Sequence, residues 1–543
     1  MTYVVTQSCC NDASCMSVCP VNCIHPAPGE PDFGHTEMVY VDPRSCIDCG
    51  ACADACPVTA IKPLDRLAGD EQVFIDLNAD YYRDRPADAP WAAPTFLPAT
   101  PKRDTPPRIA VVGTGPAASY AARELLTTSS SEVSMFDRLP VAGGLVRAGV
   151  APDHADTKRL LDMFTWTYDH PRTHMYLNVE VGRDVTHAEL LEHHDAVIYA
   201  VGARDDRLMG LPGEEELAGV HAAPEVVGWY NAHPDVAADA VDLDTERVVV
   251  VGNGNVALDV ARILLSDVDQ LARTDIADHA LAELRSSTVR EVVVVGRRGP
   301  ENAAFTRPEL LMMPRGIDVV VEHDSRVAAE IAEAEPGSKA ALLADLPQEQ
   351  IDWSAPPPPG RRLVLTFFRT VQELAGEQRL QAVRLGRSTG DPDHPHASDV
   401  TATGLLVRST GHRGTPVADL PFEATTATVP HEAGRVVDPE SGQPVAGAYV
   451  VGWIKRGATG GIGANRSDAQ ETVATVLVDL ARGDLAAPTG RRRDLERLLK
   501  SRRVDVVGRR RMRRIEAAER SRGAESGRPR VKIATVAEML RQR

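Results

Sequence analysis

From residue 108 onward, short runs of valine and isoleucine alternate with longer segments in which apolar residues recur at helical spacing. Such runs are typical of strands buried on both faces, and the helices between them cover a parallel sheet. The pattern predicts an α/β fold built from parallel sheets. Strands are expected at residues 109–112, 133–137, 196–201, 248–251, 292–295, 363–368, 404–407 and 448–451.

The first 107 residues have a different character. All nine cysteines lie within the first 56 residues, and residues 83–107 are polar and rich in proline. A stretch of that composition is typical of a semi-extended spacer. Because 543 residues exceed what one hydrophobic core supports, we expect a small cysteine-rich unit, a linker and at least two larger domains.

Composition narrows the possible partners and location. The net charge of −17 argues against nucleic acid as the main partner, although residues 491–543 are basic. No run is long and apolar enough to span a membrane, and residues 1–6 do not open a secretion signal, so we expect no membrane insertion and a cytoplasmic location. In that compartment a dense group of cysteines indicates metal binding rather than disulfides.

The spacing of four cysteines identifies the metal chemistry. Cys46, Cys49, Cys52 and Cys56, with Pro57 after the last, match the bacterial ferredoxin run. In that run three thiolates hold one cluster and the fourth reaches a second. A zinc site would need only four ligands, which the number of well-spaced cysteines exceeds. The run therefore predicts iron–sulfur clusters.

An internal repeat assigns the other cysteines. The segment that starts at Cys19-Pro20 resembles the one that starts at Cys56-Pro57, and Cys23 falls where the second copy has Ala60. We therefore expect Cys19, Cys46, Cys49 and Cys52 to hold a [4Fe–4S] cluster. Cys56, Cys15 and either Cys9 or Cys10 would hold the second. A fourth thiolate is not evident there, which favours [3Fe–4S] and leaves [4Fe–4S] open.

Two glycine-rich turns predict two dinucleotide sites. Gly113, Gly115 and Ala118 follow one strand and open a helix, which allows a tight turn and a close approach to a pyrophosphate. The next strand ends at Asp137, whose carboxylate can accept hydrogen bonds from ribose hydroxyls. A tight turn without a ligand is the alternative.

The charged residues near the second turn are basic, whereas the one near the first turn is acidic. Its residues Gly252, Asn253, Gly254, Asn255 and Val256 follow the strand at 248–251. The strand after it ends at Arg297 and Arg298, and paired guanidinium groups suit a 2′-phosphate. The two turns thus predict FAD and NADPH on one chain. Flavin converts the two electrons of NADPH into the single electrons that iron–sulfur clusters accept.

Two resemblances extend this interpretation. Residues 1–62 resemble seven-iron bacterial ferredoxins, which favours Cys9 over Cys10 as a ligand. From Arg108 the chain resembles adrenodoxin reductase and bacterial ferredoxin–NADP reductases, and the whole chain resembles their fused ferredoxin branch. The second resemblance rests on motifs at residues 144–147, 151–154, 252–262, 295–305 and 452–463.

The resemblance implies the remaining site residues. It implies that FAD contacts Ala118, Asp137, Leu145, Val181, Trp453, Gly460, Gly461 and Ile462, and that NADP contacts Arg207, Asn253, Gly254, Asn255, Val256, Arg297, Arg298, Glu309 and Gly460. It places His154 near the flavin, as the catalytic candidate. Its usual acidic partner lies a few positions beyond Glu309, where this chain has Met312, so a proton relay through that pair is not expected.

We expect an interrupted FAD domain: residues 1–62 form the ferredoxin unit, 63–107 a linker, 108–206 and 421–490 the FAD domain, 207–420 the NADP domain and 491–543 a basic extension. The predicted function is electron transfer from NADPH through FAD to iron–sulfur carriers, with the fused ferredoxin either as the internal acceptor or as a relay to an external ferredoxin or cytochrome. The extension is a solvated surface or a docking surface. The rival interpretation is a binding protein whose clusters only hold its structure.

Overall fold

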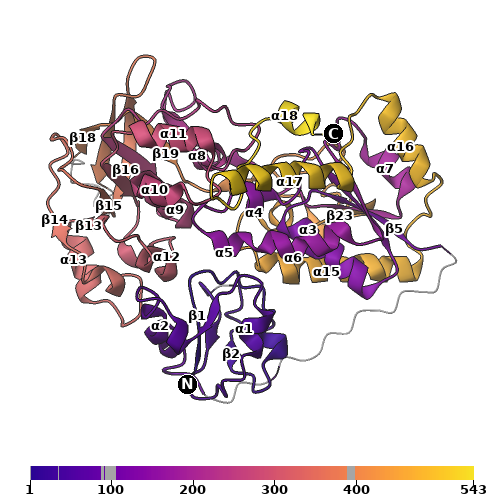
Figure 1. Ribbon diagram of the computed structural model, residues 1–543, viewed down its shortest axis with the longest axis horizontal. Helices are drawn as coiled ribbons and strands as arrows, with labels where there is room; N and C mark the ends of the chain where they lie inside the picture. The colour runs from indigo at the N-terminus through magenta and orange to yellow at the C-terminus, as the bar shows by residue number, and fades with distance from the viewer. Residues whose placement is uncertain (1, 35, 87–90, 92–104, 388–397, 543) are drawn as a thin grey trace.

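The computed structural model describes residues 2–34, 36–86, 91, 105–387 and 398–542. Two sheet domains lie side by side, and the cysteine-rich unit sits beneath their junction (Figure 1). Most of the predicted spacer, residues 87–90 and 92–104, lies outside the described residues. Within the described residues, no helix has the length and apolarity needed to cross a membrane.

The first sheet domain has seven strands in the order β21-β22-β23-β8-β5-β6-β7. The strands from β23 to β7 are parallel, and β21, β22 and β23 pair antiparallel. Helix α3, Pro116–Thr128, packs on α15, Ala464–Arg482, across one face. The strands are β5 Arg108–Val112, β6 Glu132–Asp137, β7 Thr173–Leu177, β8 Ala196–Tyr199, β21 His431–Glu432, β22 Arg435–Val437 and β23 Pro444–Val450.

The second sheet domain also has seven strands, all parallel, in the order β10-β19-β11-β12-β15-β13-β14. Its central strands are nearly all valine and leucine and are buried on both faces, as expected for β-branched residues in a covered parallel sheet. The strands are β10 Val220–Ala222, β11 Arg247–Val251, β12 Glu291–Val295, β13 Asp318–Glu322, β14 Gln348–Glu349, β15 Arg362–Thr366 and β19 Leu405–Arg408.

An antiparallel sheet of β16 Arg369–Ala375, β17 Ala382–Arg387 and β18 Ser398–Ala402 extends the second domain. Its helices include α8 Ala223–Tyr230, α9 Asn255–Leu265, α11 Asp278–Ser286, α12 Arg307–Leu311 and α13 Ser325–Ala332. The chain passes between the domains through two short strands, β9 Asp205–Asp206 and β20 His412–Arg413, which pair with each other. The second domain is therefore inserted in the chain between strands β8 and β21 of the first sheet.

These sheets confirm the predicted α/β fold class, and all eight predicted strands are present with some shifted ends. The antiparallel sheet was not predicted. Its strands are rich in polar residues and half-exposed, so they lack the apolar runs that marked the others.

The N-terminal unit, residues 2–86, contains two small antiparallel pairs. They are β1 Tyr3–Val5 with β4 Ile61–Pro63, and β2 Ile24–His25 with β3 Tyr40–Val41. Helix α1, Ala51–Ala55, carries Cys52. Helix α2, Val73–Tyr81, lies inside the region predicted as a linker, and that prediction is wrong here: Asn78 accepts hydrogen bonds from the backbone of Val5 and Val41.

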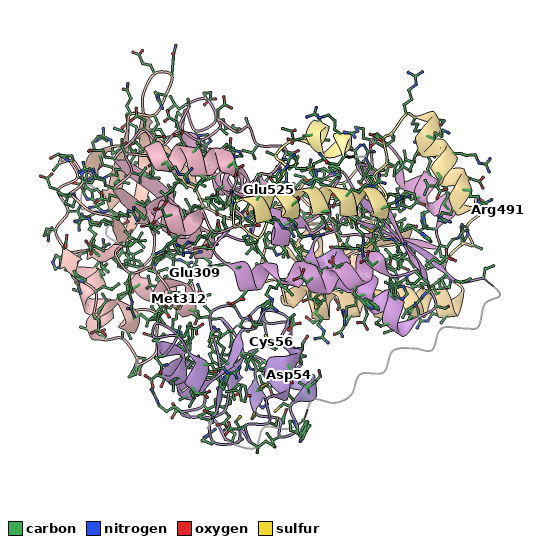
Figure 2. All side chains as sticks on the ribbon, in the orientation of Figure 1. Asp54, Cys56, Glu309, Met312, Arg491 and Glu525 are labelled. Atoms are coloured by element: carbon green, nitrogen blue, oxygen red, sulfur yellow. The ribbon has the colours of Figure 1, made fainter. Side chains whose placement is uncertain are left out.

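The basic C-terminal segment is folded against the body, and the arginines at residues 491–493, 509–510 and 513–514 are exposed, as expected of a solvated surface. It forms α16 Arg492–Ser501, α17 Arg509–Glu525 and α18 Val536–Arg541. Figure 2 shows Glu525 at the end of α17 nearest the second domain and Arg491 at the opposite edge. Glu519 of α17 is fully buried against Arg147, and Lys532 is buried against Asp275. Several basic groups therefore neutralise internal carboxylates.

Candidate functional site

A cleft of about 1670 Å³ lies between the two sheet domains and against the N-terminal unit. Typical small-molecule pockets measure roughly 300–1,000 Å³, so this cleft has room for two dinucleotides. It is lined by every predicted nucleotide-site residue except Ala118, together with His154: Gly113, Gly115, Asp137, Leu145, Val181, Arg207, Gly252, Asn253, Gly254, Asn255, Val256, Arg297, Arg298, Glu309, Trp453, Gly460, Gly461 and Ile462. Ala118 is fully buried behind the first turn.

The first turn needs glycine because its backbone is left-handed. Gly113 has a φ of 113°, and a Cβ there would lie 2.4 Å from the carbonyl oxygen of Ala200. The next residue, Thr114, donates a 2.6 Å hydrogen bond from its hydroxyl to Asp137 Oδ2. The carboxylate at the end of β6 is therefore held beside the opening of α3, where the predicted ribose would lie.

The second turn repeats this backbone. Gly252 has a φ of 106°, and a Cβ there would lie 2.2 Å from the carbonyl oxygen of Ser409. Asn255, at the start of α9, accepts a 2.7 Å hydrogen bond from the backbone of Thr306. At the end of β12, Arg297 and Arg298 are exposed at the cleft wall. They form none of the ion pairs found among the described residues, so both guanidinium groups are open to an anion.

The glycine-rich segment before α15 connects the cleft with the N-terminal unit. Gly463 donates a 2.7 Å hydrogen bond to the carbonyl oxygen of Cys10. A Cβ on Gly463 would lie 2.1 Å from the backbone of Asn11, so only glycine permits this approach. Three residues later Arg466 donates to the carbonyl oxygen of Asp12 at 2.8 Å. The cysteine loop thus rests on the segment that lines the cleft.

The second domain also contacts the N-terminal unit. Arg307 forms a 2.8 Å ion pair with Glu37, and Gln7 donates to Glu309 at 3.3 Å. Figure 2 shows Glu309 and Met312 on the part of the second domain that faces the unit. Met312 packs against the hydrophobic core that the unit shares with the first domain. Contacts from both domains therefore hold the unit at their junction.

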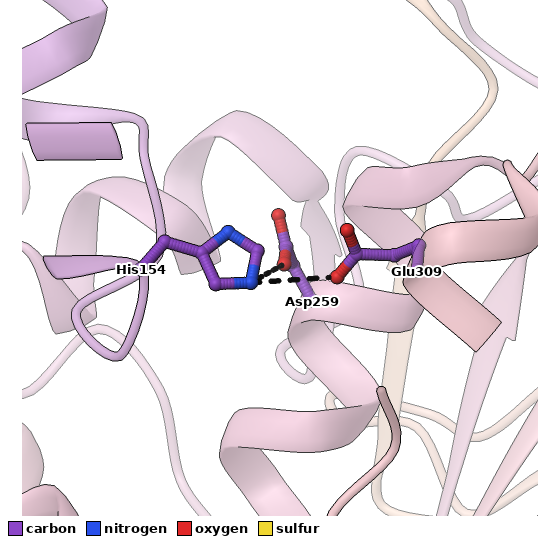
Figure 3. A group of neighbouring side chains, drawn as sticks. All are labelled: His154, Asp259 and Glu309. Atoms are coloured by element: carbon purple, nitrogen blue, oxygen red, sulfur yellow. Dashed lines mark ion pairs between the residues drawn. The ribbon is translucent and has the colours of Figure 1, made fainter. Parts of the chain in front are cut away.

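His154 faces two carboxylates across the cleft (Figure 3). Its Nε2 lies 3.5 Å from Glu309 Oε1 and 3.9 Å from Asp259 Oδ1. Arg262 binds Asp153, Asp259 and Glu309, and its Nη2 lies 2.8 Å from His154 Nε2. Because a guanidinium only donates, His154 Nε2 accepts the hydrogen bond from Arg262.

The Arg262 guanidinium lies among the three carboxylates and favours the charged forms of Asp153 and Asp259. Burial raises the pKa of Asp259 to about 6, with Arg262 opposing the rise and Glu309 adding to it. Burial also raises the pKa of Asp153, but Arg262 outweighs it and holds that pKa below its usual value. His154, Asp259 and Glu309 lie close enough to hold a metal ion. The Arg262 guanidinium already occupies that position.

The nine cysteines form two groups. Burial raises the pKa of Cys9 to about 11, and the charge of Cys56 adds to the rise. Burial likewise raises the pKa of Cys52 to about 11, with additions from Cys46, Cys19 and Cys49. The inner group is Cys9, Cys10, Cys15 and Cys56, and the outer group is Cys19, Cys23, Cys46, Cys49 and Cys52. The outer group contains the four cysteines predicted for the [4Fe–4S] cluster together with Cys23, and the inner group contains Cys15 and Cys56 with both Cys9 and Cys10.

Several site residues were missed from the sequence. Asp153, Asp259 and Arg262 are ordinary helix or turn residues in the sequence, and only the fold brings them to His154. Gly463 was expected only as the last residue of the motif at 452–463, because nothing local signals its contact with Cys10. Asp12, which lies close to the inner thiols, was also missed, although the cysteine repeat carries a signal for it.

Two nucleotide turns facing one cleft beside two cysteine groups define an iron–sulfur flavoprotein reductase. Residues 107–299 match the family described as pyridine nucleotide-disulphide oxidoreductase, and residues 39–62 match a 4Fe-4S binding domain. A probable ferredoxin/ferredoxin–NADP reductase of Mycobacterium bovis is 48% identical over 99% of this chain and 94% of its own length. Its Mycobacterium leprae counterpart is 46% identical over 99% and 97%.

Solved structures agree with this. FprA of Mycobacterium tuberculosis in complex with NADPH has a TM-score of 0.71 and 40% identity, covering 80% of this chain and 99% of that one. A His57Gln mutant of FprA has a TM-score of 0.72 with 41% identity over the same shares. The chain therefore belongs to the fused ferredoxin/ferredoxin–NADP reductases, within the adrenodoxin reductase family. It is an oxidoreductase that passes electrons from NADPH to iron–sulfur carriers.

Proposed function

We propose that NADPH held by the second turn passes its electrons to FAD held by the first turn, and that they then enter the inner cysteine group before the outer one. The observation that carries this order is the Gly463–Cys10 hydrogen bond, since it joins the cleft wall to the inner cysteine loop. The fused ferredoxin is then an internal acceptor that relays electrons outward. Bound FAD would supply the exchange between two-electron and one-electron transfer.

The residues around the cleft fit these two nucleotides. Asp137, fixed by Thr114, would accept hydrogen bonds from the FAD ribose. Arg297 and Arg298 would bind the 2′-phosphate of NADPH. The backbone N–H groups of the segment from Gly460 to Ile462 and the N-terminus of α15 would face the flavin, with Trp453 beside them. His154 would orient the reacting rings, because its Nε2 is already engaged by Arg262.

The cysteine groups fit two clusters. In the outer group Cys19, Cys46, Cys49 and Cys52 would hold a [4Fe–4S] cluster, with Cys23 buried beside it. In the inner group Cys9, Cys15 and Cys56 would supply three thiolates. Cys9 is favoured over Cys10 because its Sγ contacts Asn11 as that of Cys46 contacts Asp48.

Electrons would leave the protein from the outer cysteine group. Cys49 is exposed, and the neighbouring Ile47 is 58% exposed. An apolar side chain beside an exposed cluster ligand is a suitable contact for a small electron carrier. We therefore propose that an external ferredoxin or cytochrome docks there. The basic C-terminal segment is less suited, since much of its charge is already paired internally.

The test is rapid mixing of the reconstituted protein with NADPH under anaerobic conditions, followed by absorbance and freeze-quench EPR. Wild type should bleach its clusters without added protein. Gly463→Ala should reduce FAD normally but reduce the clusters at least about tenfold more slowly, because its Cβ displaces the cysteine loop. Ser467→Ala, exposed on the same helix, is the control. Unchanged cluster reduction in Gly463→Ala would exclude the proposed order.

A further inference from the structure

The two cysteine loops are copies of each other in backbone detail. Each residue i of the first copy corresponds to residue i + 37 of the second. Left-handed residues recur at this interval: Asn11 and Asp48 both have a φ of 58°, Asn22 and Thr59 both have a φ of 50°, and Ala13 with 59° matches Gly50 with 77°. An alanine at such an angle shows that the loop is held to this shape.

The hydrogen bonds repeat at the same interval. The backbone N–H of Cys23 donates to Cys19 Sγ at 3.3 Å, and that of Ala60 donates to Cys56 Sγ at 3.3 Å. The N–H of Cys19 donates to Met16 at 3.2 Å, as that of Cys56 donates to Ala53 at 3.3 Å. The register therefore equates Cys9, Cys15 and Cys19 with Cys46, Cys52 and Cys56.

This register places Asp12 at the position of Cys49. The first copy is then the full run Cys9-x₂-Asp12-x₂-Cys15-x₃-Cys19-Pro20, with a carboxylate in place of the second thiolate. Asp12 is only 6% exposed. It hydrogen-bonds with Ser14, and no cationic side chain among the described residues forms an ion pair with it. A buried carboxylate without a cation is costly unless a positive centre binds it.

The chain places Asp12 midway between two of the proposed ligands. Asp12 lies three residues after Cys9 and three before Cys15, in a loop whose backbone repeats that of the second copy, where the equivalent position is the ligand Cys49. Arg466 holds the loop from outside through the Asp12 carbonyl oxygen and the Ser14 hydroxyl, at 2.8 and 3.0 Å.

We propose that the Asp12 carboxylate is the fourth protein ligand of the inner cluster, which makes that cluster a [4Fe–4S] centre with one exchangeable iron. This rests on the proposed function, which places a cluster there. Three irons keep thiolate ligands, and the fourth is bound by a harder oxygen ligand. A one-electron oxidant such as ferricyanide converts [4Fe–4S]²⁺ into [3Fe–4S]⁺, releasing Fe²⁺ and one electron to the oxidant.

The test uses the full-length, anaerobically reconstituted protein with iron counting, Mössbauer spectroscopy and EPR. Wild type should hold about eight irons, lose about one to ferricyanide as a [3Fe–4S] EPR signal grows, and regain it with Fe²⁺ and dithionite. Asp12→Cys should hold about eight and resist that loss. Asp12→Asn keeps the acceptor for Ser14 but should stay at about seven under all conditions.

Controls separate the possible failures. Asp54→Asn changes an exposed carboxyl of the same unit and should behave as wild type; Figure 2 shows Asp54 beside Cys56 in that unit. The outer cluster serves as the internal reference for folding. The ligand proposal is overturned if Asp12→Asn restores its fourth iron like wild type, or if Asp12→Cys loses iron as readily. Wild type without any cluster would instead refute the proposed function.

Discussion

The two dinucleotide turns share a backbone and differ in charge. Each residue i of the first turn corresponds to i + 139 in the second, so Gly113 matches Gly252. Both glycines are left-handed, and each faces the carbonyl oxygen of the residue that follows a strand, Ala200 after β8 and Ser409 after β19. The residues at the end of the next strand differ: Asp137 is fixed by Thr114 on one side, whereas Arg297 and Arg298 are exposed on the other.

The helices behind the turns differ as well. In α9 the position of Tyr120 in α3 is taken by Asp259, which reaches His154 together with Arg262. Tyr120 is buried against Phe164 and has no role at the cleft. The shared glycines therefore predict that each turn binds a dinucleotide. The side chains around each turn determine which dinucleotide binds and which residues of the other domain lie beside it.

The largest effect should come from the glycines themselves. Gly252→Ala should leave FAD bound but lower kcat/KM for NADPH at least about 100-fold, since the strain and the clash with Ser409 cost about 3 kcal/mol or more. Gly113→Ala should instead yield protein without flavin. Flavin release on denaturation and steady-state kinetics measure both. Equal flavin loss in the two variants would mean that the turns are not separate sites.

The charge difference comes next. Arg297→Ala should raise KM for NADPH about 10- to 100-fold and leave KM for NADH nearly unchanged, because charge-assisted hydrogen bonds contribute about 1.5–3 kcal/mol. Arg273→Ala, exposed elsewhere in the second domain, is the control. A comparable rise for both nucleotides would contradict the 2′-phosphate assignment.

The carboxylate on α9 should have a pH signature. Because burial raises the pKa of Asp259 to about 6, this carboxyl binds more protons in the folded state than in the unfolded state between about pH 4 and 6. This contribution to stability is complete below that window and is lost as pH rises through 6. The Tm of Asp259→Asn minus that of wild type should therefore rise by a few degrees across this window in calorimetry, because the variant lacks the buried charge. A difference that stays constant or falls there would refute the assignment.

The smallest effect concerns Thr114. Thr114→Val removes one hydrogen bond to Asp137 and should weaken FAD binding about 3- to 10-fold, from about 0.5–1.5 kcal/mol. NADPH binding should not change. Flavin titration of the deflavinated protein measures the loss. Thr127→Val, exposed at the end of α3, is the matched control.

Local sequence patterns were enough to predict most of the fold and many of the candidate site residues. Valine runs located the strands, and Asp137 and Arg297 were found because each follows a strand in a known register. The same holds for the cysteines, whose spacing encodes their grouping. Asp12 could have been found as well, by extending the cysteine repeat from Cys19 back towards Cys9.

Contacts between distant segments could not be found this way. Gly463 and Cys10 are far apart in sequence, and a glycine after a glycine-rich loop carries no mark of what packs on it. The buried Glu519 and Lys532 lie in a segment whose charge suggested solvent. Their partners Arg147 and Asp275 belong to other elements, so only the assembled chain reveals them.

The C-terminal segment ties the two sheet domains together mechanically. Glu519 anchors α17 to the first domain through Arg147, whereas Lys532 and Arg528 bind Asp275 and Asp278 of the second. Rotating one domain against the other would break a buried ion pair, which would cost about 3–5 kcal/mol of stability. We therefore expect the angle between the two sheet domains to stay fixed while nucleotides bind and leave. We also expect both domains to unfold in one cooperative thermal transition.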